Sequence, residues 1–236
     1  MIWRLLICFS VAGAWGCCTQ VTGQIELRDS KESSTKKPPD LSGVVVSLVP
    51  ADGEPLPQAT TQHARMLQKD KTFLPHVLPV RAGTIIDFPN LDPIFHNAFS
   101  NYSGEIFDVG LYAPGTSRAV KFSRVGVVRV FCNIHPAMSA VIVVLNTPYF
   151  AKTDSRGRFS LEAPPGKYEL HVFHERASES TLKALTRVIQ VSDDPLPLAP
   201  IVISEAGYLP APHMNKYGKP YPASVDENTM YPGVRK

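Results

Sequence analysis

The sequence predicts an all-β protein in which a first β-sandwich is followed by a second, small antiparallel β-sandwich, with extended termini on either side. Short apolar or alternating runs recur between turn signals, and no stretch of residues 43–147 sustains a helical period. The 22 prolines and 15 glycines supply many turns. Hydrophobic residues make up 44% of the 236 residues and charged residues 19%, which allows a core and excludes a wholly disordered chain.

Residues 1–23 have the order of residue types of a secretory signal peptide, with one Arg, then an apolar run, then small residues. The apolar run is too short for a good membrane span. Cleavage after Gly16 or Gly23, lipidation of Cys17 and an uncleaved anchor all remain open. We therefore expect an exported protein, periplasmic or extracellular, with no integral span beyond such an anchor. A linker of Ser, Lys, Pro and Asp is expected at residues 24–42.

The first sandwich is predicted at residues 43–147. Turn signals such as Ala51-Asp52-Gly53 and Pro114-Gly115 separate its strands. We expect these strands at residues 44–48, 77–80, 84–88, 97–100, 119–122, 127–132 and 140–145.

The second sandwich is predicted at residues 148–205 as an antiparallel meander. Tyr168, Leu170, Val172 and His174 recur at every second position, which predicts that one face of their strand is buried. We expect strands at residues 149–153, 158–161, 167–174, 186–191 and 201–204. Residues 178–185 are consistent with one helical turn or with a loop.

The tail at residues 206–236 is rich in Tyr, Pro, Lys and Asn and cannot form a core of its own. Such a tail is either disordered or laid across the body or a partner. The composition favours disorder.

Cysteine use leaves a single thiol in the folded body. The four cysteines are Cys8, Cys17, Cys18 and Cys132, and the first three lie in or beside the export segment. A lone thiol in an exported protein awaits a partner, is buried and inert, or binds a metal.

The neighbours of Cys132 favour the metal. Cys132 ends a predicted strand, and a tight loop then presents His135 and Met138 before the next strand begins. Thiolate and thioether are soft donors and imidazole suits copper, so this set selects copper over calcium or magnesium. A further His has to come from a different strand, and the candidate is His96, which opens the strand at residues 97–100.

The region of about residues 77–145 resembles the cupredoxins. Its Cys-x-x-His-x-x-Met loop, with Pro136 after the His, is similar to the short ligand loop of amicyanin, whereas plastocyanin-like proteins have a longer gap between His and Met. The resemblance implies a Greek-key β-sandwich that binds one type 1, or blue, copper ion. The implied ligands are His96, Cys132 and His135 in the equatorial plane and Met138 on the axis. It also implies that the side chain of Asn97 ties the two ligand-bearing loops together.

The second sandwich resembles, more loosely, the transthyretin-like, or carboxypeptidase regulatory-like, fold. The residues that carry this resemblance are 153–159 and 165–168. It implies a fold and no activity, so we expect this unit to be a spacer or a docking surface.

These features predict a protein that carries single electrons between redox partners. We do not expect an enzyme, because a copper site capped by Met leaves no open position for a substrate. The partner is expected to be a cytochrome or an oxidoreductase that docks near His135, on a surface formed by Pro136, Ala137, Pro93 and Ile94. The net charge of +3 gives no reason to expect nucleic acid.

Other interpretations stay open. Cys and two His also suit zinc, although Met is a poor fourth ligand for it. A copper-delivery protein would bind copper without redox cycling, and a metal-free structural module would bind none. His76 is either a hydrogen-bonded structural residue or part of a second metal site. His171 and His174, three apart on one strand, face opposite sides and cannot chelate together.

Overall fold

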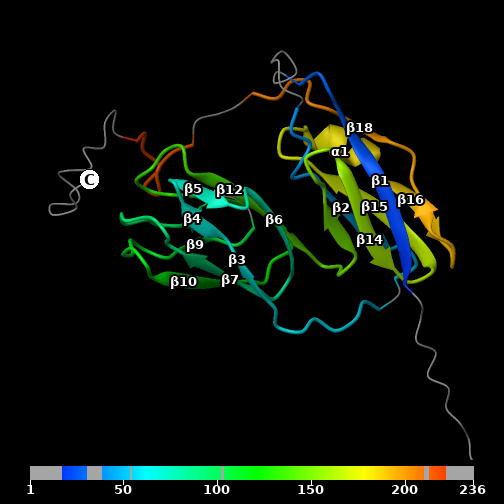
Figure 1. Ribbon diagram of the computed structural model, residues 1–236, viewed down its shortest axis with the longest axis horizontal. Helices are drawn as coiled ribbons and strands as arrows, with labels where there is room; N and C mark the ends of the chain where they lie inside the picture. Colours follow the sequence, from blue (N-terminus) through cyan, green and yellow to red (C-terminus); the bar gives the residue numbers. More distant parts are fainter. Residues whose placement is uncertain (1–17, 31–38, 54, 102–103, 210–212, 222–236) are drawn as a thin grey trace, which may run out of the picture.

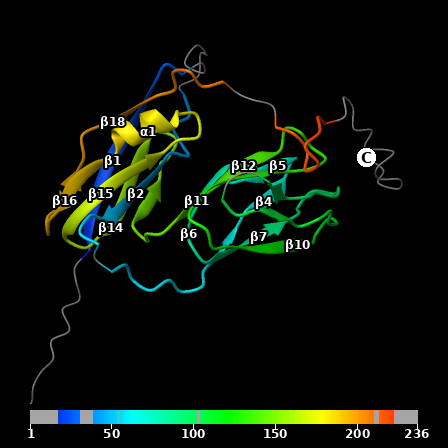
Figure 2. The same cartoon turned by 180° about the vertical axis from the view of Figure 1, so that it is seen from behind.

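The structure is a computed structural model that describes residues 18–30, 39–53, 55–101, 104–209 and 213–221. Apart from one short helix, every regular element of this part of the chain is a strand. Figures 1 and 2, which view the molecule from opposite sides, show two layered units side by side along its long axis. The predicted all-β class with two sandwiches is confirmed.

The first sandwich consists of a small sheet packed against a larger one. The small sheet has the order β10 (Ser117–Phe122), β7 (Thr84–Pro89) and β3 (His63–Arg65). The larger sheet has the order β6 (Val77–Arg81), β12 (Ser139–Leu145), β11 (Gly126–Phe131), β8 (Phe99–Ser100) and β9 (Phe107–Asp108). A hairpin of β4 (Leu67–Lys69) and β5 (Thr72–Leu74) completes this unit. Alternate side chains of the strands, among them Ile86, Phe88, Val130 and Ile142, fill its core.

The second sandwich also has two sheets around its own core. One sheet has the order β13 (Phe150–Lys152), β2 (Val45–Pro50), β15 (Gly166–Phe173) and β16 (Arg187–Val191). The other has the order β14 (Arg158–Ala163), β1 (Thr19–Arg28) and β17 (Leu196–Pro197), and β18 (Ile201–Ser204) also pairs with β1. Both β17 and β18 run parallel to β1, so this sandwich is not the purely antiparallel meander that the sequence predicts. The predicted buried face is confirmed, since Tyr168, Leu170, Val172 and His174 are all buried.

Residues 178–185, for which the sequence allowed either a helical turn or a loop, contain helix α1 (Glu179–Leu185). Ser178 caps it, because its hydroxyl oxygen accepts a hydrogen bond from the backbone N–H of Thr181 at 3.1 Å. Among the described residues, no helix combines the length and the apolar character that crossing a membrane would require.

The boundary between the sandwiches differs from the predicted one. Residues 19–28, which the prediction divides between the export segment and a linker, form β1 of the second sandwich. Residues 45–50, assigned by the prediction to the first sandwich, form β2 of the second, between β13 and β15. The prediction followed chain order, whereas sheet partners can be far apart in sequence: the side chains of Gln20 and Ser160, 140 residues apart, are hydrogen-bonded.

The first sandwich is therefore an insertion within the second. The chain leaves the second sandwich after β2 and returns to it at β13, and these two strands are antiparallel neighbours. The hydroxyl of Thr147 donates to the carbonyl of Leu48 at 2.7 Å, so the two connections to the inserted unit lie close together. Insertions are tolerated where the entering and leaving ends of the chain are near each other.

Strand β1 overlaps the predicted export segment, residues 1–23, and therefore limits where that segment can be cleaved. Residues 1–17, with Cys8 and Cys17, lie outside the described residues. Within β1, Val21 is fully buried and Gly23 pairs with Phe159 of β14. Cleavage after Gly23 would remove this core side chain and half of the strand, so the structure disfavours that cleavage position.

Strand β12 is buried on both faces. Its residues Ala140, Ile142 and Val144 enter the core of the first sandwich, whereas Val141 and Val143 point the other way. A strand buried on both faces has an unbroken apolar run instead of an alternating one. The outward-facing side chains form a third apolar cluster that joins the two sandwiches and consists of Val45, Val77, Val141 and Val143.

A polar pair also links the two sandwiches. Nε2 of His76, which precedes β6, is 2.9 and 3.0 Å from the two carboxylate oxygens of Glu175, which follows β15. Nδ1 of His76 is 3.1 Å from the carbonyl oxygen of Ser139. The structure thus gives His76 a hydrogen-bonded structural role. His174 lies 2.6 Å from buried Glu205, and His171 pairs with Glu169 at 3.3 Å on the exposed face, so these two histidines face opposite sides as predicted.

We expect the His76–Glu175 pair to make stability depend on pH. The hydrogen bond to Glu175 raises the pKa of His76 above 6.5, so its contribution to stability is complete below pH 6.5 and is lost as the pH rises through the folded-state pKa. Burial alone would raise the pKa of Glu175, but the contact with His76 outweighs it and lowers this pKa below 4.5. The carboxylate's contribution is therefore complete above pH 4.5 and is lost as the pH falls through its folded-state pKa.

Glu175→Gln should accordingly reduce stability most between pH 4.5 and 6.5, and progressively less at higher pH. Denaturant unfolding of the wild-type and variant proteins across this range measures the difference. A loss of stability that is the same at every pH would contradict the expectation.

Candidate metal centre

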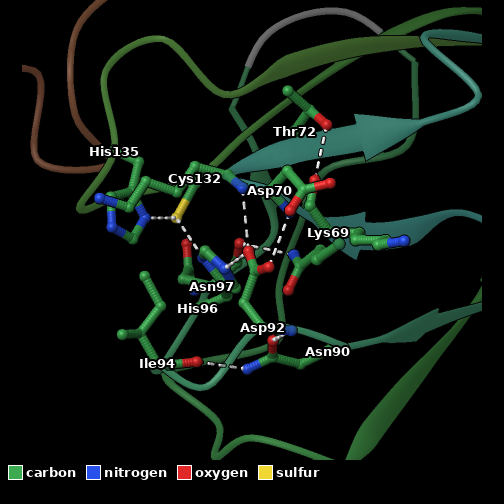
Figure 3. Close-up of polar contacts among 12 residues, drawn as sticks. Lys69, Asp70, Thr72, Asn90, Asp92, Ile94, His96, Asn97, Cys132 and His135 are labelled. Atoms are coloured by element: carbon green, nitrogen blue, oxygen red, sulfur yellow. Dashed lines mark hydrogen bonds and ion pairs between the residues drawn. The ribbon is translucent and has the colours of Figure 1, made fainter. Parts of the chain in front are cut away.

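Three of the four predicted ligands converge on one buried point. The ligand atoms of His96, Cys132 and His135 all lie within 4.8 Å of one another. Figure 3 shows both rings directed at the sulfur: Sγ of Cys132 is 3.9 Å from Nδ1 of His96 and 3.6 Å from Nδ1 of His135. Cys132 and His96 are fully buried, and His135 is 7% exposed.

These spacings fit a single metal ion. An ion held about 2.3 Å from sulfur and about 2.0 Å from nitrogen, with bonds about 120° apart, requires the sulfur and nitrogen to be roughly 3.7 Å apart. The two measured separations, 3.6 and 3.9 Å, lie on either side of that value. Both sulfur-to-nitrogen separations therefore suit a shared ion. The two imidazole nitrogens lie within 4.8 Å of each other and would need to be about 3.5 Å apart in the same geometry, so the rings would close around the ion.

The ligand loop, residues 132–138, is pinned by its own backbone. It connects β11 to β12, and because these strands are antiparallel partners the loop leaves and returns at the same end of the sheet. The N–H of Cys132 donates to the carbonyl of Met138 at 3.2 Å, and the N–H of Met138 donates to the carbonyl of His135 at 3.0 Å. These bonds hold the side chains of Cys132 and His135 in a fixed relation.

His96 is placed by a bridge and by the turn before it. Its backbone forms an antiparallel bridge with Tyr112, with N···O distances of 3.2 and 2.9 Å. In the preceding loop, Oδ1 of Asn90 accepts from the N–H of Asp92 at 3.0 Å, and Nδ2 of Asn90 donates to the carbonyl of Ile94 at 2.7 Å. Asn suits this position because its side-chain amide takes the place of a backbone partner in a turn.

Asp92 binds the second ring nitrogen of His96. Its Oδ2 is 2.7 Å from Nε2, and the two side chains are 8% and 0% exposed (Figure 3). The carboxylate also accepts from the N–H groups of Asp70 at 2.7 Å and Lys71 at 2.9 Å, in the turn between β4 and β5. Both turn residues have left-handed backbone conformations, as a two-residue type I′ hairpin requires. The hairpin thus anchors the carboxylate that orients the histidine.

This pair sets the tautomer of His96. Burial lowers the pKa of His96, which favours the neutral ring. Burial alone would raise the pKa of Asp92, but hydrogen bonds from Lys71, His96 and Asp70 outweigh it and lower that pKa. Because a carboxylate can only accept, the ring proton sits on Nε2, and the lone pair on Nδ1 faces Cys132. Metal-binding histidines in proteins share this arrangement, with the other nitrogen on a carboxylate or carbonyl.

The surroundings of Cys132 affect its pKa in two opposite directions. Burial raises its pKa, so the metal-free site holds a thiol. The backbone N–H groups of Ile134, Asn97 and His135 act in the opposite direction and lower that pKa. Hydrogen bonds to the sulfur of this kind stabilise a thiolate once a cation replaces the proton.

The remaining two predicted residues lie next to the triangle. Met138 is fully buried, in the same core cluster as Cys132. Oδ1 of Asn97 accepts from the N–H of Asn133 at 3.3 Å, which ties the His96 segment to the ligand loop. Nδ2 of Asn97 donates to Asp108 at 2.7 Å and to the carbonyl of Gly110 at 2.9 Å. The link between the two loops is the one that the sequence predicts, whereas coordination by Met138 stays a prediction.

Two parts of the site were missed at the level of sequence. Asp92 lies four residues before His96, and an acidic residue so close to a candidate ligand was the available signal. The second part is residues 213–221, which contact the ligand loop, so here the alternative of a tail laid across the body holds and the favoured alternative of disorder does not. Residues 222–236 lie outside the described residues.

Comparison with known proteins gives similarity to solved structures only. No protein-family model matches the chain, and no curated protein matches it. A purple cupredoxin from Nitrosopumilus maritimus is 21% identical, with 35% of this chain and 99% of that one covered and a TM-score of 0.32. A reduced amicyanin variant is 15% identical, with 44% of this chain and 99% of that one covered and a TM-score of 0.34.

A copper-containing nitrite reductase from Thermus scotoductus SA-01 is 24% identical, with 41% of this chain covered and a TM-score of 0.34. This chain spans only 25% of the length of that enzyme. These three matches each cover less than half of the chain, and the transthyretin-like resemblance of the second sandwich stays a prediction.

Asp92→Asn tests the anchoring of His96. We expect this change to weaken metal binding by about 10–100-fold, because a neutral amide holds the Nε2–H less firmly than a carboxylate does. Titration with copper in competition with a chromophoric chelator measures the affinity. Asp87→Asn, which alters a β7 carboxylate paired with exposed His63, is the control and should bind like the wild type. Equal affinity in the Asp92 variant and the wild type would contradict the assignment.

Proposed function

We propose that this chain is an exported copper protein that carries single electrons through one type 1 site, with His96, Cys132, His135 and Met138 as ligands. The observation that carries the proposal is the buried triangle of one sulfur and two Nδ1 atoms, with sulfur-to-nitrogen separations of 3.6 and 3.9 Å. Two imidazoles, one thiolate and a weak axial Met are the donor set of blue-copper electron-transfer sites. Met138, in the same core cluster as Cys132, is the proposed axial donor.

The donor set favours copper over zinc. Structural zinc sites take four ligands from Cys and His. Within the described ranges, the cluster offers three such donors, and the fourth nearby candidate is a thioether. Thioethers are soft ligands that suit copper(I) and contribute little to zinc.

The fixed donors favour electron transfer over copper delivery. His96 is held by Asp92, and Cys132 and His135 are held by a short loop that contains two backbone hydrogen bonds. Bound copper supplies a one-electron couple at this position. Donors that cannot move far apart suit both oxidation states with little rearrangement, whereas delivery requires donors that separate readily. A site capped by Met leaves no open position for a substrate, so the proposal includes no catalysis.

We propose that a cytochrome or an oxidoreductase docks at the end of the first sandwich that carries the ligand loop. Pro93, Phe95, Pro136 and Ala137 are exposed and adjoin the ligands in sequence. His135 itself is only 7% exposed, so a partner would meet these apolar neighbours before the imidazole. Weak redox encounters need only a small buried area.

Copper loading tests the function directly. We expect one copper ion per chain, intense visible absorption from thiolate-to-copper(II) charge transfer, and reversible one-electron reduction with the copper retained. Cys132→Ser should abolish the colour because it removes the thiolate, whereas Cys18→Ser, at an exposed cysteine, should leave it unchanged. Visible and electron paramagnetic resonance spectra, voltammetry and a copper count before and after cycling measure these properties. Loss of copper on reduction would favour a delivery protein, and failure to bind copper would rule out both functions.

A further inference from the structure

The C-terminal segment 213–221, here called the strap, lies across the ligand loop. It follows the second sandwich in sequence, yet Figure 1 shows it in orange-red at the end of the first sandwich that faces away from the second. Nε2 of His213 is 2.7 Å from the carbonyl oxygen of Pro136, and the hydroxyl of Tyr221 donates to the carbonyl of Cys132 at 2.7 Å. Both acceptors belong to the ligand loop.

Aromatic contacts seat the strap beside the thiol. The ring of His213 stacks on Phe131, the residue before Cys132, with the centroids 4.0 Å apart and an interplanar angle of 27°. The ring of Tyr221 meets His213 edge-on, at 5.1 Å and 85°. A carbonyl can only accept, so the contact with Pro136 requires the proton of His213 on Nε2. The rings of His213 and Tyr221 therefore direct two donors at the backbone of the ligand loop.

Lys216 closes a ring of hydrogen bonds that includes both ligand-bearing segments. Its backbone N–H donates to Oδ1 of Asn133 at 2.9 Å, and the N–H of Asn133 donates to Oδ1 of Asn97 at 3.3 Å. Nδ2 of Asn97 donates to Oδ1 of Asp108 at 2.7 Å, and Nζ of Lys216 donates to Oδ2 of the same carboxylate at 2.7 Å. The strap thus completes the network through which Asn97 joins the His96 segment to the ligand loop.

We propose that the strap is a built part of the metal site, in which Tyr221 and Lys216 are positioning residues that hold the ligand loop in its metal-binding conformation. This inference rests on the proposed function. A hydrogen bond to the carbonyl of Cys132 restrains the backbone that carries the thiolate, and partners outside the ligand set fix ligand geometry in metal sites. The loop's own two hydrogen bonds act from within, and the strap acts from outside.

The strap should also slow the release of metal. Cys132, His135 and Met138 all lie on one loop, so an ion can leave most easily when that loop moves away from His96. The strap's contacts with Cys132, Asn133 and Pro136 oppose that movement. Removing one of them should therefore change copper release and the spectrum of the site, and should leave uptake of one ion intact.

Two matched pairs of variants in the full-length, copper-loaded protein test the proposal. Tyr221→Phe removes the hydroxyl that reaches the carbonyl of Cys132. Tyr168→Phe, the control, removes a hydroxyl that also donates to a backbone carbonyl, that of Pro164 at 2.9 Å, but in the second sandwich. Lys216→Met removes the ammonium that reaches Asp108, and Lys219→Met makes that change at an exposed lysine. The measurements are the rate of Cu(I) transfer to bathocuproine disulfonate, the visible and paramagnetic resonance spectra, and the unfolding midpoint of the metal-free protein.

We expect Tyr221→Phe and Lys216→Met each to release copper about 2–10-fold faster, which corresponds to the loss of one ordinary hydrogen bond. The spectra of these two variants should shift, while the controls match the wild type and all four unfolding midpoints stay close to it. Wild-type rates and spectra in Tyr221→Phe and Lys216→Met would overturn the inference and leave the function standing. Equal acceleration in all four variants would overturn it as well. Failure of the wild type to bind copper would contradict the proposed function and this inference with it.

Discussion

The buried polar atoms of Cys132 and His96 need hydrogen-bond partners, and much of the surroundings of the site follows from that constraint. A buried polar group left without a partner costs about 1–3 kcal/mol. Asp92 takes the Nε2–H of His96, and the N–H groups of Asn97, Ile134 and His135 point at the sulfur of Cys132. These contacts leave the lone pairs of the sulfur and of Nδ1 of His96 directed at one centre, an arrangement that a soft cation stabilises.

Three parts of the chain hold the ligands in place. The β4–β5 hairpin fixes the carboxylate behind His96, the antiparallel pair β11 and β12 fixes the ends of the ligand loop, and residues 213–221 contact that loop from outside. The two strands adjoin the ligand loop in sequence, whereas the hairpin and residues 213–221 are distant from the ligands that they support. Geometry at the centre therefore depends on the whole end of the first sandwich, because each support contributes bonds that the others cannot replace.

The insertion of one sandwich into the other connects the site to the rest of the molecule. Strand β12 leaves the ligand loop and, through Val141 and Val143, packs against Val45 of the second sandwich. The chain then passes through the second sandwich, and residues 213–221 lie back on the first (Figure 2). The second sandwich thus supports the inner strand of the metal site and precedes the segment that covers its ligand loop. This arrangement gives it a structural role in the site without any ligand of its own among the described residues.

The sequence by itself determined the all-β class, most strand positions and the candidate ligands His96, Cys132 and His135, because strand alternation and ligand spacing are properties of neighbouring residues. Only the tertiary structure decided that β1 and β2 belong to the second sandwich, since a strand's own pattern does not name its partner. The apolar run of β12 signals burial on both faces but not what covers each face. The roles of Asp92 and of residues 213–221 were likewise visible only in the tertiary structure. They depend on hydrogen bonds made across space, which composition and spacing do not encode.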